Sequence, residues 1–196
     1  MGLREEKKRE TRDAIVATAL ELFRTQGFEG TRIQDIAQRL RISEATFFNY
    51  FPTKQSVLAA VADGMIASSV ETLAREATDA DRSVSDRLHE VARVFSAQFE
   101  GDRAFIALLA SHTRYFLGER TGRFEQAYVL LSQLFSEGQR RGEIRSDIPP
   151  DQLAELFLTL TFAAIQGWVA VDAPGPPLNE RLAVAASVLI DGCHTR

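Results

Sequence analysis

Hydrophobic residues recur every three or four positions along most of the chain, which is the spacing of helices that bury one face. The first such segment is predicted at residues 9–27, where Ile15, Ala19, Leu22 and Phe23 share a face and Gly27 ends the helix. Runs that alternate apolar and polar residues, as half-buried strands do, are nearly absent. The pattern therefore predicts an all-α chain.

Two short helices are predicted next, within "TRIQDIAQRLRISEATFFNYFPTK", residues 31–54. Thr31 and Gln34 have the spacing of a capping box, and Ser43 is a suitable N-cap for a second helix that Pro52 ends. The apolar face of the first helix consists of Ile33, Ile36, Ala37 and Leu40. Two short helices joined by about three residues predict a helix-turn-helix.

The remaining pattern predicts a larger helical bundle. Its helices are expected at residues 53–79, 83–100, 102–118 and 123–142, from the proline pair at 149–150 to Pro174, and from about Leu178 to Cys193. We therefore expect about nine helices in two domains. The N-terminal helix-turn-helix domain takes residues 1–54, and the C-terminal bundle takes residues 55–196.

The side chains of the second short helix divide into two sets. If Phe47 and Phe51 point inward, Thr46, Asn49 and Tyr50 point outward, where hydroxyl and amide groups reach base edges or phosphates. The basic residues near the ends of the helix pair are Arg32, Arg41 and Lys54. Spacing alone leaves open a second interpretation, in which the stretch is only a tight αα turn in a helical core.

The stretch "GFEGTRIQDIAQRLRISEATFFNYFPTKQSVL", Gly27 to Leu58, resembles the DNA-binding domain of the TetR family of bacterial transcriptional regulators. The shared features are a glycine-led turn, a threonine, Ile-Ala, a turn ending in Ile-Ser, an aromatic residue, phenylalanine, and a lysine before an apolar helix. The resemblance covers nearly all of residues 9–69. It implies a homodimer that binds a palindromic double-stranded DNA operator, with a C-terminal bundle that dimerises and binds a small inducer. In this family, repression is the commoner mode of action.

The resemblance also assigns DNA contacts. Thr31 and Lys54 match family positions that contact phosphates, and Ser43 through Tyr50 match the recognition helix and its cap. The residues expected to contact DNA are Thr31, Arg32, Arg41, Ser43, Glu44, Ala45, Thr46, Phe48, Asn49, Tyr50 and Lys54.

Several of these positions depart from the family pattern. Arg41 replaces the usual glycine of the turn, so either its backbone is left-handed, at a cost of about 1 kcal/mol, or the turn differs. Ala45 replaces another glycine, which is harmless in a helix. Phe48 replaces a tyrosine that donates to phosphate, so either Tyr50 makes that bond or one contact is lost. The Glu44 carboxylate either faces solvent at the helix start or accepts from a cytosine amino group.

The formal net charge of −4 does not exclude DNA binding, because charges act within a Debye length of about 8 to 10 Å. Residues 1–54 hold ten basic and eight acidic residues, whereas the rest holds thirteen and nineteen. An N-terminal arm carries Arg4, Lys7, Lys8 and Arg9, and it either follows a DNA groove or is frayed and solvated.

The last two predicted helices carry apolar stripes. They contain the expected dimer interface: Leu156, Leu160, Ala164, Trp168, Leu182, Ala185, Ala186 and Leu189. In TetR-like proteins the matching helix pair packs against its twofold mate. The alternative is that both stripes face the core of their own chain.

The middle helices mix aromatic residues with isolated polar groups, as mainly apolar ligand pockets do. The candidate pocket residues are Phe95, Gln98, Phe99, Phe105, His112, Tyr115, Phe116, Tyr128, Gln166 and Trp168. Each of them alone is also an ordinary core residue. We expect a small apolar or aromatic effector, whose identity the sequence does not reveal.

Other function classes find no support in the residues. The chain has one cysteine, Cys193, and three histidines, without HExxH, CxxC, a nucleophile elbow or a phosphate loop, so we expect no enzyme, cofactor or metal. No apolar segment follows the charged N-terminus, so we expect no signal peptide. The longest apolar run, residues 156–171, is shorter than the roughly 18 residues that a bilayer requires, which predicts a buried helix.

These observations predict a cytoplasmic regulator that associates with the nucleoid when it is bound to DNA. One alternative function stays open: a TetR-like module that binds a ligand or another protein, with DNA binding weakened by Arg41, Glu44 and Phe48.

Overall fold

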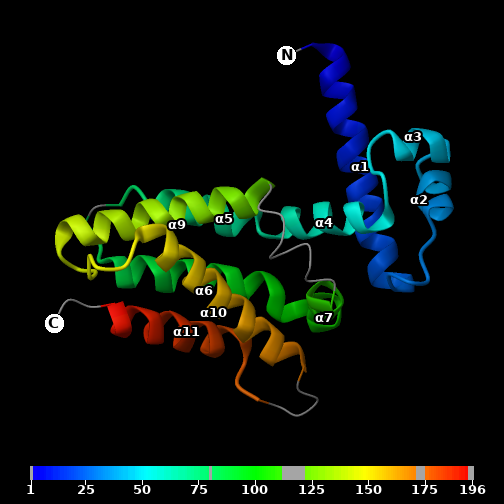
Figure 1. Ribbon diagram of the computed structural model, residues 1–196. Helices are drawn as coiled ribbons and strands as arrows, with labels where there is room; N and C mark the ends of the chain where they lie inside the picture. The colour runs from blue at the N-terminus through cyan, green and yellow to red at the C-terminus, as the bar shows by residue number, and fades with distance from the viewer. Residues whose placement is uncertain (1, 80, 112–121, 171–174, 194–196) are drawn as a thin grey trace. The chain divides into compact units, whose positions relative to one another are not determined.

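The computed structural model describes residues 2–79, 81–111, 122–170 and 175–193. These residues form helices and connecting turns, with no strand among them, and the all-α prediction is confirmed (Figure 1). The chain divides into two compact units, Met1–Gly64 and Met65–Arg196.

The N-terminal unit is a small helical domain with its own aromatic core. Its helices are α1 (Leu3–Gln26), α2 (Ile33–Arg39), α3 (Glu44–Phe48) and α4 (Lys54–Met65). The core residues include Ile15, Ala19, Leu22 and Phe23 of α1, together with Phe28, Ile36, Phe47, Phe51, Val57 and Leu58. The inward orientation predicted for Ile36, Phe47 and Phe51 is confirmed, whereas Leu40 is half-buried.

The start of α2 differs from the predicted capping box. The Thr31 hydroxyl is turned back to donate to the Gly27 carbonyl at 2.8 Å, so it caps no helix. The N-cap position is Arg32 instead, and its backbone N–H donates to the Asp35 carboxylate at 2.9 Å. The prediction that paired Thr31 with Gln34 is therefore wrong, because the loop path places Thr31 in the core, with 1% of its surface exposed.

The predicted single helix over residues 53–79 is two helices, α4 and α5 (Ala67–Glu76). The interruption lies at Ile66, whose ψ of 3° departs from the helical value near −42°. Gly64 precedes the interruption by two residues, and glycine is a poor helix former. A continuous apolar stripe in the sequence therefore concealed a helix boundary.

The C-terminal unit is a bundle. Besides α5 it contains α6 (Val84–Phe99), the 3-10 turn η1 (Glu100–Asp102), α7 (Arg103–Ser111), α9 (Gly122–Arg141), α10 (Pro150–Ala170) and α11 (Leu178–Cys193). Helix α10 packs against α9, α11 and α7, and α6 packs against α11 and α5 (Figure 1). The predicted bounds of α11 are confirmed. The predicted helix at residues 102–118 begins as α7, and its second half lies outside the described residues.

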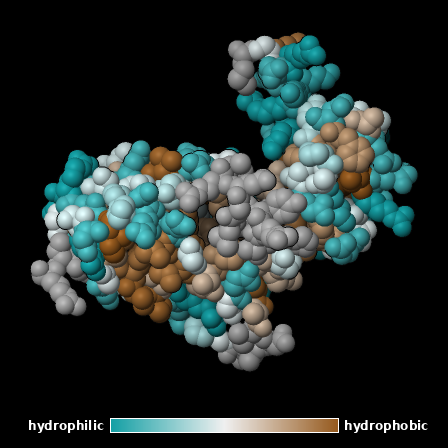
Figure 2. Space-filling model, viewed as in Figure 1, coloured by the Kyte–Doolittle hydropathy of each residue, from teal (hydrophilic) through white to brown (hydrophobic). Residues whose placement is uncertain are grey.

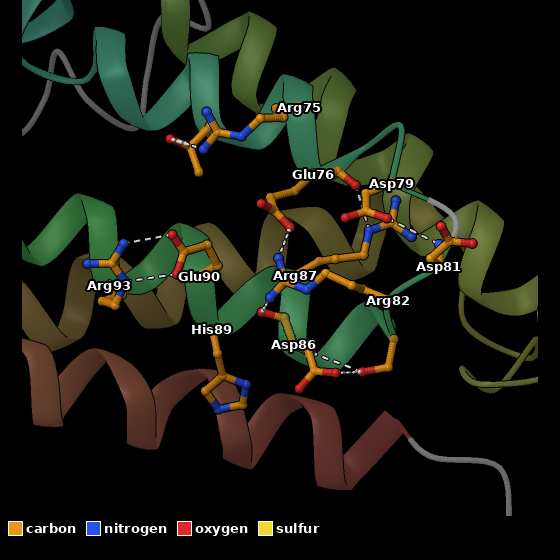
Figure 3. Close-up of polar contacts among 12 residues, drawn as sticks. Arg75, Glu76, Asp79, Asp81, Arg82, Asp86, Arg87, His89, Glu90 and Arg93 are labelled. Atoms are coloured by element: carbon orange, nitrogen blue, oxygen red, sulfur yellow. Dashed lines mark hydrogen bonds and ion pairs between the residues drawn. The ribbon is translucent and has the colours of Figure 1, made fainter.

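A buried arginine ties three helices of this bundle together. Arg87 of α6 is 0% exposed, and its Nε donates to the Glu76 carbonyl oxygen at the end of α5 at 2.6 Å. Its two terminal nitrogens donate to both carboxylate oxygens of Glu137 on α9, at 3.3 and 3.2 Å. The Glu76 carboxylate pairs with Arg82 at 2.7 Å (Figure 3). The charges therefore compensate one another inside the bundle.

Candidate DNA-binding surface

The turn between α2 and α3 is a Schellman motif built around Arg41. The Arg41 N–H donates to the Gln38 carbonyl at 3.1 Å, and the Ile42 N–H donates to the Ala37 carbonyl at 3.0 Å. Arg41 itself has a φ of 56°, a left-handed conformation that glycine usually supplies. The first of the two alternatives predicted for this turn, a left-handed arginine, is confirmed.

Helix α3 begins at a polar cap, as predicted. The Ser43 hydroxyl oxygen accepts from the Thr46 backbone N–H at 3.0 Å, and the two hydroxyl oxygens lie 2.8 Å apart. The helix ends at Phe48, so Asn49 and Tyr50 lie in the turn that follows rather than inside a helix reaching Phe51. Thr46, whose hydroxyl is engaged with Ser43, is half-buried.

The outer surface of α3 combines apolar and polar side chains. Glu44, Ala45 and Asn49 are exposed, and Tyr50 is half-buried. Phe48 is 47% exposed, with its ring edge-on against Phe47 at 5.7 Å between centroids. A phenyl ring in this position offers only apolar contact, whereas Asn49 and Tyr50 offer hydrogen bonds.

Thr31 and Lys54 hold the loop between α1 and α2. The Lys54 ammonium donates to the carbonyl oxygens of Phe28 and Thr31 at 2.6 and 3.0 Å, and it lies 4.3 Å from the centre of the Phe28 ring. With Thr31 buried, the predicted phosphate contacts of these two residues stay predictions. One open groove is nevertheless lined by Thr31, Arg32, Glu44 and Lys54, so the structure brings these four candidates together.

Two other predicted DNA-contact residues line a second groove. Asn49 and Tyr50 line it together with Glu5, Lys8, Arg9 and Arg12 of α1. Sequence reasoning treated the first residues as an arm and did not include Arg12. The signal was present, because Lys8, Arg12 and Ile15 follow the same helical spacing as the core stripe of α1.

The candidate ligand residues of the C-terminal unit occupy packed helices. Phe99 and Phe105 are buried, and the Phe95 ring lies 4.5 Å from that of Phe99. The Gln166 amide donates to the Ala110 carbonyl at 3.0 Å, which joins α10 to α7. The remaining described candidates, Gln98, Tyr128 and Trp168, are half-buried. His112, Tyr115 and Phe116 lie outside the described residues, and the pocket stays a prediction.

The exposed apolar face of α10 and α11 differs from the predicted one. Leu182, Ala186 and Leu189 are buried in the core of their own chain, because they face α6 and α10, so they are unavailable to a partner. Leu160, Ala164, Trp168 and Ala185 are half-buried. The apolar residues that remain open are Leu156, Val184 and Val188, which are 42%, 63% and 61% exposed. Figure 2 shows hydrophobic surface gathered over this part of the C-terminal unit.

Helix α10 is long and apolar enough to cross a membrane, judged by length and composition alone. The sequence-based estimate was too short because the helix begins at Pro150, six residues before the apolar run. In the structure α10 packs against three neighbouring helices. In the described part of the chain, no group of three or more histidine, cysteine, aspartate or glutamate residues is placed to hold a metal ion.

Some known proteins match only a short segment of the chain, and others match nearly all of it. Residues 15–61 match the family model described as bacterial regulatory proteins, tetR family. The chain is 45% identical over 56 residues to the HTH-type transcriptional regulator TcmR of Streptomyces glaucescens, a match that spans 29% of this chain and 25% of TcmR. The TcmR match is therefore confined to a segment of 56 residues.

Two other relatives extend over nearly the whole chain. The HTH-type transcriptional repressor DhaR of Mycobacterium sp. (strain GP1) is 24% identical over 183 residues, covering 91% of this chain and 92% of DhaR. The crystal structure of Thermus thermophilus FadR, a TetR family transcriptional repressor in complex with lauroyl-CoA, superposes with a TM-score of 0.76 at 27% identity. That superposition covers 94% of this chain and 96% of FadR. Residues 15–61 therefore carry the DNA-binding domain of the TetR family of bacterial transcriptional regulators, and the chain as a whole has the fold of a TetR family repressor.

Proposed function

We propose that this protein is a ligand-responsive transcriptional repressor that binds a palindromic DNA operator as a homodimer. The observation that carries the proposal is the construction of α3. Buried Phe47 and Phe51 fix it on the N-terminal core, while Asn49, Tyr50 and Phe48 remain accessible. A short, rigidly held helix with accessible amide, hydroxyl and apolar groups suits base and phosphate contacts in the major groove.

A dimer is part of the proposal because one helix-turn-helix reads too few base pairs for specificity. Val184 and Val188 are one helical turn apart on α11, and both are largely exposed. Leu156 on the neighbouring α10 adds to this open apolar face. A second copy that packs against the same face of its twofold mate would cover all three residues.

The repressor and effector roles rest on the relatives. DhaR and FadR are both described as repressors, and FadR was solved with lauroyl-CoA. Phe95, Phe99 and Phe105 give the middle of the C-terminal unit an aromatic interior, which suits a small apolar or aromatic effector. We place the protein in the cytoplasm, at the nucleoid when it is bound to DNA.

A DNA-binding titration tests the proposal. We expect the dimer to bind a palindrome near its own gene with a dissociation constant of about 10 nM or tighter, and the affinity to fall as salt is raised. Undetectable or salt-independent binding to every upstream fragment would contradict the repressor function.

Substitutions in α3 and its following turn provide the matched test. Asn49→Ala and Tyr50→Ala should each weaken operator binding, because each removes a hydrogen-bonding group from the reading surface. Gln126→Ala, which removes an exposed amide from α9, is the control and should leave the affinity unchanged. Light scattering should show the same oligomer for all three variants. If Asn49→Ala and Tyr50→Ala bind the operator with unchanged affinity, the turn after α3 is not part of the DNA interface.

A second candidate function follows from three features of the same surface. Phe48 has no hydroxyl, the exposed Glu44 carboxylate repels phosphate, and Lys54 is held by backbone carbonyls. These features favour a module that binds its ligand or a protein while binding DNA weakly. Effector binding in the absence of any DNA binding would support that alternative.

A further inference from the structure

The first turns of α1 carry basic residues on the same helix face that, farther along, packs against the core. Helix α1 starts at Leu3, whereas its apolar stripe starts at Ile15. Lys8 lies two helical turns before Ile15, and Arg12 lies two turns before Ala19, so the basic residues continue the stripe that packs on the domain. Figure 1 shows this end of α1 projecting past α2 and α3.

Three of the acidic residues in this part of the helix lie away from its basic face. At 3.6 residues per turn, Glu6, Glu10 and Asp13 fall on the side of α1 opposite to Lys8 and Arg12. All five side chains are exposed. Glu5 and Asp13 each lie one turn from Arg9, but in the described residues no ion pair involves Lys8, Arg9 or Arg12.

The basic face shares a groove with the end of the recognition element. Lys8, Arg9 and Arg12 line this groove together with Asn49 and Tyr50. The Arg12 guanidinium lies 4.9 Å from the centre of the Phe51 ring, a cation–π contact that holds it beside the turn after α3. Three cationic side chains, one amide and one phenol therefore converge on one open site.

We propose that this groove binds a phosphate of the DNA backbone next to the bases that α3 contacts. Lys8, Arg9 and Arg12 supply charge and donors, and the Tyr50 hydroxyl supplies the neutral donor that Phe48 lacks. The inference rests on the proposed DNA-binding function and deepens it. Under this proposal, the N-terminal turns of α1 are part of the DNA interface and not a solvated arm.

The groove also contains one opposing charge. The Glu5 carboxylate lines it and repels phosphate, so it limits the affinity that the cations provide. The proposal therefore requires effects of opposite sign at two neighbouring positions. Neutralising Glu5 should tighten DNA binding, and removing Lys8 should weaken it.

Adjacent residues of the same charge provide matched controls. Lys7 and Glu6 carry the charges of Lys8 and Glu5, but they lie on other sides of α1 and do not line the groove. Lys8→Ala is therefore compared with Lys7→Ala, and Glu5→Gln with Glu6→Gln. Each pair changes the net charge equally, so a difference within a pair reports local contact rather than long-range attraction.

The full-length protein and its variants are titrated with a DNA duplex of mixed sequence, and then with an upstream fragment, over a range of salt concentrations. For Lys8→Ala we expect severalfold weaker binding to both DNAs and a salt slope that is smaller by about 1. Lys7→Ala should keep the wild-type slope. Glu5→Gln should bind severalfold more tightly than Glu6→Gln. Circular dichroism checks that α1 remains helical in each variant.

The possible failures are distinguishable. If wild-type protein binds DNA but Lys8→Ala and Lys7→Ala behave alike, the groove is not a phosphate site. A loss confined to the upstream fragment would also overturn it, because phosphate contacts carry no sequence preference. If the wild-type protein binds no duplex even at low salt, the proposed function itself fails.

Discussion

At the scale of single residues, Arg41 stands out because, in the described chain, it is the one residue other than glycine with a positive φ. Its positive φ lets the chain leave α2 and enter α3 across four residues, 40–43. The Cβ atom makes this conformation cost about 1 kcal/mol or more. The two hydrogen bonds of the Schellman motif offset this cost.

Replacing Arg41 with glycine should leave the free energy of unfolding unchanged or raise it by up to about 1 kcal/mol. The gain is limited because glycine also increases the entropy of the unfolded chain. Ala17→Gly, at an exposed helical position of α1, is the control and should lower stability by about 1 kcal/mol. Urea denaturation measures both. A loss at Arg41 as large as the loss at Ala17 would mean that the turn is unstrained.

The local sequence was enough to predict the roles of Arg41 and Ser43, but not that of Thr31. Arg41 stands out because a turn of this length normally requires glycine, and Ser43 stands out because a hydroxyl before a helix is a common cap. Thr31 was misassigned because its hydroxyl bonds to the carbonyl of Gly27, four residues earlier. That contact depends on the path of the loop, which hydrophobic spacing does not encode.

At the scale of helices, the Arg87 cluster joins α5, α6 and α9. The side chain of Glu137 is 19% exposed, and its hydrogen bonds from Arg87 hold the pKa of its carboxyl below the ordinary value, although burial acts in the opposite direction. Arg141 contributes a second, weaker interaction at 3.4 Å. The cluster contributes to stability because the buried guanidinium has an anionic partner.

Glu137→Gln should lower the free energy of unfolding by about 3 kcal/mol or more, since it leaves the Arg87 charge buried without its anion. Glu90→Gln breaks the solvent-exposed pair with Arg93 on α6 and should cost less than about 1 kcal/mol. Chemical denaturation at neutral pH compares the two variants. Equal losses would show that the buried pair has no special role.

The pH dependence has a definite sign. Because the pKa of Glu137 is lowered in the folded state, its contribution to stability is present above the unfolded pKa of about 4.3 and is lost as the pH falls through the folded pKa. Below about pH 4.3 the wild-type protein should therefore lose stability more steeply than Glu137→Gln. Denaturation at a series of acid pH values measures the two slopes, and parallel slopes would contradict the assignment.

Helix bounds were predictable where the chain itself marks them. Proline residues precede α10 and α11, and the predicted span of α11 agrees with the structure. The break at Ile66 was missed because apolar residues continue on both sides of it. The extension of α1 to Leu3 was missed because its first turns contain charged residues without apolar periodicity. The dimer face on α10 and α11 stays a prediction, and the deeper stripe of α11, with Leu182, Ala186 and Leu189, belongs to the chain's own core.

At the scale of the whole molecule, α10 and α11 carry the surface that we propose joins two copies. Val184 and Val188 are more exposed than the other large apolar side chains of the described chain except Leu3. An isolated exposed valine is ordinary, but two on one helical face beside Leu156 form a patch that a partner can cover. Operator binding depends on this patch if the dimer positions two α3 helices on one palindrome.

Val184→Asp places a charge on that patch and should convert the dimer to a folded monomer, because burying an unpaired carboxylate in an interface is costly. The monomer should lose most operator affinity, since only one half-site contact remains. Val129→Asp makes the same change at a 43% exposed position on α9 and should leave both properties intact. Sedimentation velocity and DNA titration measure them. If Val184→Asp remains dimeric while Val129→Asp dissociates, the interface lies on α9 rather than on the α10 and α11 face.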